Sequence, residues 1–71
     1  MNKAKLEAIL KRERIANGVT MQKLADVIGV KTIGSYYRKE VGLLNFSLKE
    51  AILLARFYGK TVEELFGAAL E

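Results

Sequence analysis

The stretch TMQKLADVIGVKTIGSYYRKE, residues 20–40, decides the fold expected for this chain of 71 residues. It opens on Thr20, a favourable helix N-cap. Apolar residues at helical spacing follow on one face: Leu24, Ala25 and Ile28. Gly29 then supplies the left-handed residue that ends a helix and turns the chain. Because a second helical segment runs on to Glu40, the stretch predicts a helix-turn-helix, the unit that lays its second helix in the major groove of DNA.

The second helix of this unit has two candidate starts. Thr32 as N-cap leaves Gly34 inside the first turn, whereas Ser35 as N-cap leaves a helix barely longer than one turn. A glycine inside a helix costs about 1 kcal/mol. That cost is smaller near the first turn than the loss of half the element, so we expect the helix to be capped by Thr32.

The N-terminal segment predicts a helix that packs against this unit. Asn2 is its expected cap, and Asn17-Gly18 is its expected stop. Its inward-facing residues are expected to be Leu6, Ile9, Leu10 and Ile15.

The C-terminal third carries two capping boxes, in which a Ser or Thr N-cap and a Glu three residues later bond each other's backbone N–H. The pairs are Ser47 with Glu50 and Thr61 with Glu64. The first opens a helix that runs to about Tyr58, and the second opens the last helix. With no Pro and a stop or start signal at every junction, the chain is predicted to be all-α, a compact five-helix single domain over residues 1–71.

The last two helices carry more apolar residues than one core-facing stripe needs. On the helix after Ser47, the expected core face consists of Leu48, Ala51, Ile52, Ala55 and Tyr58. The apolar set of the last helix is Val62, Leu65, Phe66, Ala69 and Leu70. Surplus apolar residues on a small domain indicate an interface, so a homodimer is predicted. Its expected contact residues are Leu53, Phe57, Phe66 and Leu70.

The composition of the chain restricts the classes of function that it can have. The chain has no Cys and no His, which removes disulfides, the usual zinc ligands and the usual partners of nucleophilic catalysis. We therefore expect no enzyme activity, no metal and no cofactor, and no small-molecule ligand is evident. No apolar run approaches a bilayer span and no signal-peptide core develops, so a cytoplasmic protein without membrane contact is expected.

The net charge of +4 is unevenly distributed. The residues through Gly42 include nine basic and four acidic side chains, whereas the remainder includes three basic and four acidic ones. A basic excess confined to the half with the helix-turn-helix is typical of a surface that meets phosphate. It is equally typical of a solvated face, so charge alone does not choose between the two.

Taken together, these features resemble a known family. The matching positions are Arg14, Gly18, Leu24-Ala25, Gly29-Val30, Glu40-x-Gly42, Ser47-Leu48, Ala55 and Glu64-Leu65-Phe66. These positions occur in the order, and close to the spacing, of the Cro and repressor family of phage-type helix-turn-helix proteins, also called the xenobiotic-response-element family, and the chain resembles that family. The resemblance implies a lambda-repressor-like DNA-binding domain. It also implies a phage- or prophage-type transcriptional repressor in a bacterial cell, bound as a homodimer to operator half-sites.

Two positions depart from the family pattern. Met21 stands where the family usually has a Gln that reaches phosphate, with Gln22 beside it. One extra residue lies between Gly29 and Glu40, and we place it in the turn near Lys31. These departures favour an alternative, a protein-interaction module of antitoxin-like or phage accessory type that keeps the fold and binds DNA only non-specifically.

The resemblance also assigns site residues. It makes Arg14 and Glu40 a structural ion pair, puts Tyr36 in the core and turns Tyr37 outward. Base contacts are expected from Ile33, Gly34, Ser35, Tyr37 and Arg38. Of these, Arg38 is the strongest candidate, because Arg donates bidentately to guanine O6 and N7. Phosphate contacts are expected from Met21, Gln22, Lys23, Lys31, Thr32, Lys39 and Asn45.

Overall fold

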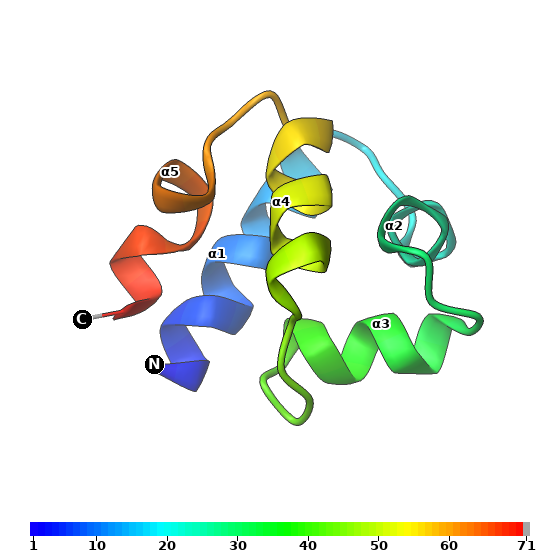
Figure 1. Ribbon diagram of the computed structural model, residues 1–71, viewed down its shortest axis with the longest axis horizontal. Coiled ribbons are helices and arrows are strands. Elements are labelled where there is room, and N and C mark those ends of the chain that lie inside the picture. The colour runs from blue at the N-terminus through cyan, green and yellow to red at the C-terminus, as the bar shows by residue number, and fades with distance from the viewer. Residues whose placement is uncertain (71) are drawn as a thin grey trace.

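The computed structural model describes residues 1–70, and every regular element in that range is a helix (Figure 1). The elements are α1 (Lys3–Ala16), α2 (Met21–Ile28), α3 (Ile33–Glu40), α4 (Leu48–Phe57), α5 (Val62–Phe66) and a final 3-10 helix, η1 (Gly67–Leu70). This confirms the all-α, five-helix prediction. The expected last helix is shorter than its apolar pattern suggested, since the α-helix ends at Phe66 and the chain tightens into the 3-10 turn.

Each α-helix begins at the side-chain cap that its sequence indicated. Thr32 Oγ1 accepts a hydrogen bond from Ser35 N at 3.0 Å, so α3 starts at the Thr32 cap and the alternative cap, Ser35, is wrong. Both capping boxes form as predicted. The turn between α2 and α3 opens on Gly29 at φ 80°, a left-handed conformation that glycine adopts without steric cost. Lys31, near which we place the extra residue of this turn, is exposed.

α4 stands between two groups of helices (Figure 1). It packs against α2 on one side and against α5 on the other, while α1 contacts α3, α5 and η1. The N-terminal cap of α1 meets η1, because Asn2 N donates to Ala69 O at 2.7 Å. α3 packs on α2 and α1 at one edge of the molecule, which leaves its remaining face open to solvent.

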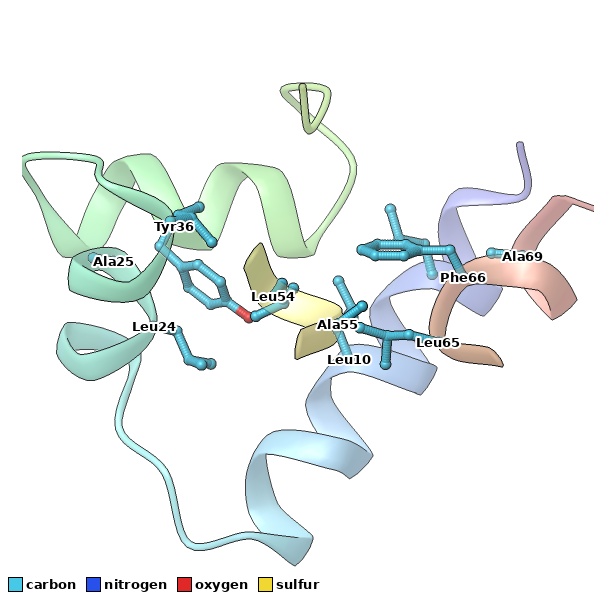
Figure 2. Close-up of a cluster of buried hydrophobic side chains, with 11 residues drawn as sticks. Leu10, Leu24, Ala25, Tyr36, Leu54, Ala55, Leu65, Phe66 and Ala69 are labelled. Atoms are coloured by element: carbon cyan, nitrogen blue, oxygen red, sulfur yellow. The ribbon is translucent and has the colours of Figure 1, made fainter. Parts of the chain in front are cut away.

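The core is one cluster of buried apolar side chains, to which every helix from α1 to η1 contributes (Figure 2). Tyr36 reaches from α3 towards Leu24 of α2 and Leu54 of α4, and all three side chains are completely buried. At the other end Phe66 meets Phe46 edge-on, with ring centroids 5.5 Å apart. A single continuous core therefore connects α2 and α3 to the C-terminal helices.

The structure corrects the expected core face of α4. Leu54, which the predicted set omitted, is fully buried, whereas Leu48 is 74% exposed. The buried stripe of α4 is centred on Leu54 and Ala55, and the first turn with Leu48 extends beyond the core. Ile15 was also expected to point inward and is 62% exposed, because the last turn of α1 likewise runs past the core.

An ion pair joins α1 to the end of α3. Arg14 Nε lies 3.2 Å from Glu40 Oε1, and Glu40 is only 1% exposed. Its second oxygen, Oε2, is buried without a hydrogen-bond partner, as are the hydroxyls of Tyr36 and Tyr58. Burial raises the pKa of Tyr58 to about 12. Removing one member of a buried ion pair such as Arg14 and Glu40 costs about 3 to 5 kcal/mol, because the other charge is left buried and unpaired.

Burial also raises the pKa of Glu40, and the Arg14 guanidinium offsets this only in part. A carboxyl whose pKa is raised by folding holds its proton to higher pH in the folded chain than in the unfolded one. The free energy of unfolding therefore falls as pH rises from the ordinary value of 4.5 through the raised value. Glu50 acts in the opposite sense at lower pH. Burial raises its pKa, but hydrogen bonds from Ser47 and Lys39 outweigh this and lower the pKa below 4.5. The contribution of Glu50 to the free energy of unfolding is therefore lost as pH falls through the lowered pKa.

We therefore predict that the free energy of unfolding is greatest near pH 4.5 and declines as pH rises above it. Glu40→Gln should remove the decline above that pH, because no carboxylate is then ionised in the core. Urea unfolding between pH 4 and pH 8, followed by circular dichroism, measures this. Glu63→Gln changes an exposed glutamate of α5 and should leave the decline unchanged. A flat profile for the unmodified chain would contradict the prediction.

Candidate nucleic-acid interface

The two sides of α3 have opposite environments. Tyr36 and Glu40, one helical turn apart, are buried. Ile33 and Tyr37, also one turn apart, are 46% and 47% exposed. The buried pair therefore fixes the rotation of α3 about its axis, and the solvent face carries the residues expected to read bases.

The five expected base-contacting residues lie together on or beside this solvent face. Ile33, Tyr37 and Arg38 are exposed, and Gly34 and Ser35 are half-buried. Among residues 1–70, Arg38 forms no ion pair, so its guanidinium donors are not committed to another side chain. Ser35 is partly engaged, because its hydroxyl oxygen accepts a hydrogen bond from Thr32 Oγ1 at 3.0 Å.

The expected phosphate-contacting residues divide into available and engaged groups. Lys23 and Lys31 are exposed, and within the described part of the chain neither forms an ion pair. Gln22 is exposed too, although its amide donates to Asp26 Oδ1 at 3.2 Å along α2. Thr32 uses its hydroxyl to cap α3.

Met21 has a half-buried side chain that packs against the core. A thioether offers no donor to phosphate. What this position presents is the backbone N–H of the first residue of α2, one of the donors that an α-helix leaves without an intrahelical acceptor.

Lys39, an expected phosphate contact, is engaged within the protein. Its ammonium donates to Asn45 O at 2.9 Å and to Glu50 Oε1 at 3.0 Å, and only 14% of the side chain is exposed. Lys39 therefore ties the end of α3 to the following loop and to α4. No local pattern pairs it with Glu50, whose capping role was recognised, because the contact depends on how α3 and α4 meet. The Asn45 residue itself is exposed.

The loop after α3 is held tightly against the N-terminus. Gly42 has φ 83°, and a Cβ at this position would lie 2.9 Å from Lys3 Cγ, so only glycine fits. Leu43 N and Leu44 N both donate to Arg38 O, at 2.8 and 3.0 Å. These contacts fix the backbone from which the Arg38 side chain departs.

Within residues 1–70, no group of three or more His, Cys, Asp and Glu residues is placed to hold a metal ion. In that range no helix is both long enough and apolar enough to cross a membrane.

An exposed helix, held by a buried face and preceded by a short helix across a glycine turn, defines a helix-turn-helix DNA-binding domain. The chain belongs to the helix-turn-helix family of the Cro and repressor type, whose family model matches residues 10–65. It is a DNA-binding protein, and its partner is double-stranded DNA. No curated protein and no solved structure matched the chain.

The separation of free from engaged lysines leads to a prediction about salt. Lys23→Ala or Lys31→Ala should weaken binding to all duplexes alike and lower the slope of log K against log salt by about one, since each removes one phosphate contact. Lys39→Ala should leave that slope unchanged and instead lower the stability of the fold, because it leaves the half-buried Glu50 without its cation. Filter binding between about 50 and 200 mM salt measures the slopes. If Lys39→Ala lowered the salt slope as much as Lys23→Ala, the contacts of Lys39 with Asn45 O and Glu50 would have to open when the protein binds DNA.

Proposed function

We propose that this protein is a sequence-specific transcriptional repressor of phage or prophage type that binds an operator of two half-sites as a homodimer in the bacterial cytoplasm. The observation that carries the proposal is the rotation of α3. Tyr36 and Glu40 hold one face in the core, so the opposite face presents Ile33, Tyr37 and Arg38, and Arg38 forms no ion pair within residues 1–70.

The exposed residues suit different features of a DNA duplex. The Arg38 guanidinium matches the two acceptors of guanine, O6 and N7. Ile33 offers an apolar contact to a thymine methyl group. Lys23 and Lys31 supply phosphate contacts that position the domain without reading sequence. Together they make one half-site reader, and a domain of this size needs a second half-site for useful specificity.

Operator selection from a random duplex pool tests the proposal. The unmodified chain should enrich one motif, and Arg38→Ala should lose about 1 to 3 kcal/mol on that motif and relax the preference at one base pair. Arg56→Ala, which removes an exposed arginine of α4, is the matched control and should change neither. Enrichment of no motif by the unmodified chain would overturn the repressor proposal.

The surface proposed for dimer contact is an apolar groove beside the end of α3. Its exposed rim residues are Met1, Leu44, Leu48 and Leu70. The groove has a volume of about 580 Å³ and is also lined by Phe46, Ala51, Val62 and Phe66. Three of the four rim side chains are at least two-thirds exposed, at 67 to 74%, a concentration of apolar surface that marks an interface on a domain of this size.

Two of the four contact residues expected from the sequence, Phe66 and Leu70, line this groove, and the other two, Leu53 and Phe57, do not. Phe66 is only 5% exposed and belongs to the core, so it lines the groove without protruding from it. Leu53 is half-buried, and the Phe57 ring packs edge-on against Tyr58, with centroids 5.3 Å apart. Leu70 is retained.

We assign the groove to a second copy of the chain. It is bordered by Gly42, Leu44 and Asn45, the loop that directly follows the recognition helix. A two-fold axis through this side would therefore bring two α3 helices towards one face of the DNA. Protruding leucines beside an apolar hollow also suit a self-complementary contact, in which each copy inserts its rim into the groove of the other.

Sedimentation across micromolar concentrations tests the dimer. Leu48→Glu and Leu70→Glu should shift the chain towards monomer and weaken binding to a two-half-site operator more than to a single half-site. Leu48 is the first residue of α4, where an acidic side chain is compatible with the helix dipole, so this variant should fold. Phe57→Glu is the control and should remain dimeric. An unmodified chain that stays monomeric would contradict the assignment.

The groove is also the observation that favours the second candidate function, a protein-interaction module of antitoxin-like or phage accessory type. A monomeric chain that binds every duplex with the same weak affinity would support the module, in which a different protein occupies the groove.

A further inference from the structure

The side chain of Arg38 lies back along α3 over Gly34. A Cβ built on Gly34 would be 3.7 Å from both terminal nitrogens of the Arg38 guanidinium and 3.9 Å from its Cζ. Long side chains in helices lean towards the N-terminus, which accounts for the direction. The guanidinium therefore sits one turn closer to the start of α3 than the Cα of Arg38.

Nothing ionic holds the guanidinium there. Within residues 1–70 no carboxylate pairs with Arg38, and its position rests on a backbone fixed by Leu43 N and Leu44 N and on the surface offered by Gly34. All the guanidinium donors thus remain free to bind DNA. Gly34 itself is half-buried although it has no side chain, as expected for a residue covered by its neighbour.

We propose that Gly34 is a positioning residue that determines specificity through Arg38. This inference rests on the proposed function, in which Arg38 reads a base. The bare backbone at Gly34 is the surface on which the guanidinium lies, so the donors are delivered over the first turn of α3, beside Ile33. The guanine read by Arg38 is then the base that faces this first turn.

The distances set the size limit at position 34. A Cβ at 3.7 Å is in ordinary van der Waals contact, so alanine fits beneath the guanidinium. Atoms beyond Cβ take the space that the guanidinium occupies. Alanine should therefore preserve the arrangement, and valine should displace it. Gly34 does not require glycine for its backbone, since it is not among the glycines with positive φ.

A double-mutant cycle on the full chain tests the positioning role. Gly34→Ala should bind the selected operator within about twofold of the unmodified chain, and Gly34→Val should weaken binding by about tenfold and relax the same base pair as Arg38→Ala. In the Arg38→Ala background, Gly34→Val should cost less than about twofold more, because its effect passes through Arg38. Equal losses in both backgrounds would overturn the proposal and assign Gly34 to direct backbone approach to DNA. No loss for Gly34→Val would also overturn it.

Two controls separate positioning from stability. Gly67→Val makes the same exchange at the other glycine without positive φ, in η1, where a Cβ would lie 3.5 Å from Glu63 Cγ. It should leave base preference unchanged. Melting followed by circular dichroism should show that Gly34→Val remains folded at the binding temperature.

A measurement without DNA keeps the inference distinct from the proposed function. In the free chain, the order parameter of the Arg38 Nε–Hε group by NMR should exceed those of Arg12 and Arg56, two exposed arginines, and Gly34→Val should lower it to their level. If no operator is selected, the repressor proposal fails and this spectrum alone decides the positioning role. An Arg38 signal as mobile as that of Arg12 in the unmodified chain overturns the inference.

Discussion

The burial of Tyr36 and Glu40 on one face of α3 is the constraint on which the rest of the structure depends. Their one-turn spacing puts both side chains under α2, α4 and α1, and Arg14 meets the carboxylate at 3.2 Å. Because the two residues share a face, the helix has only one rotation that satisfies both. This anchoring turns Ile33, Tyr37 and Arg38 to solvent, so packing in the core sets the orientation of the proposed DNA-binding surface.

Three consecutive residues at the end of α3 show how closely structure and binding are joined. Arg38 is exposed, Lys39 is bonded to Asn45 O and Glu50, and Glu40 is buried. Two neighbouring cations therefore differ in their partners: Lys39 is bonded within the protein, whereas Arg38 forms no ion pair within residues 1–70 and is the proposed base contact. The buried cluster around Glu40 keeps polar atoms without partners, a cost to stability that a purely apolar core would not carry.

Much of the fold was predictable because its signals are local. Each N-cap bonds a backbone N–H three residues on, within a single turn, so the caps at Thr20, Thr32 and Ser47 could be read directly from residue types. Errors arose where a signal required the path of a helix through the core. The spacing of Leu48 is right for the buried stripe of α4, but the helix begins before the core does, and only Leu54 and Ala55, further along, are enclosed.

The sequence by itself determined the helices, their starts and the helix-turn-helix, because caps, glycine turns and apolar spacing act over a few residues. The tertiary structure decided which charged side chains form ion pairs within the protein and which remain exposed without one. The pairing of Lys39 with Glu50, eleven residues away, and the placement of the Arg38 guanidinium over Gly34 depend on side-chain paths and helix packing that no local pattern encodes. The apolar groove was likewise decided only by the fold, because Met1, Leu44 and Leu70 lie on three separate segments that meet when the termini close against α4.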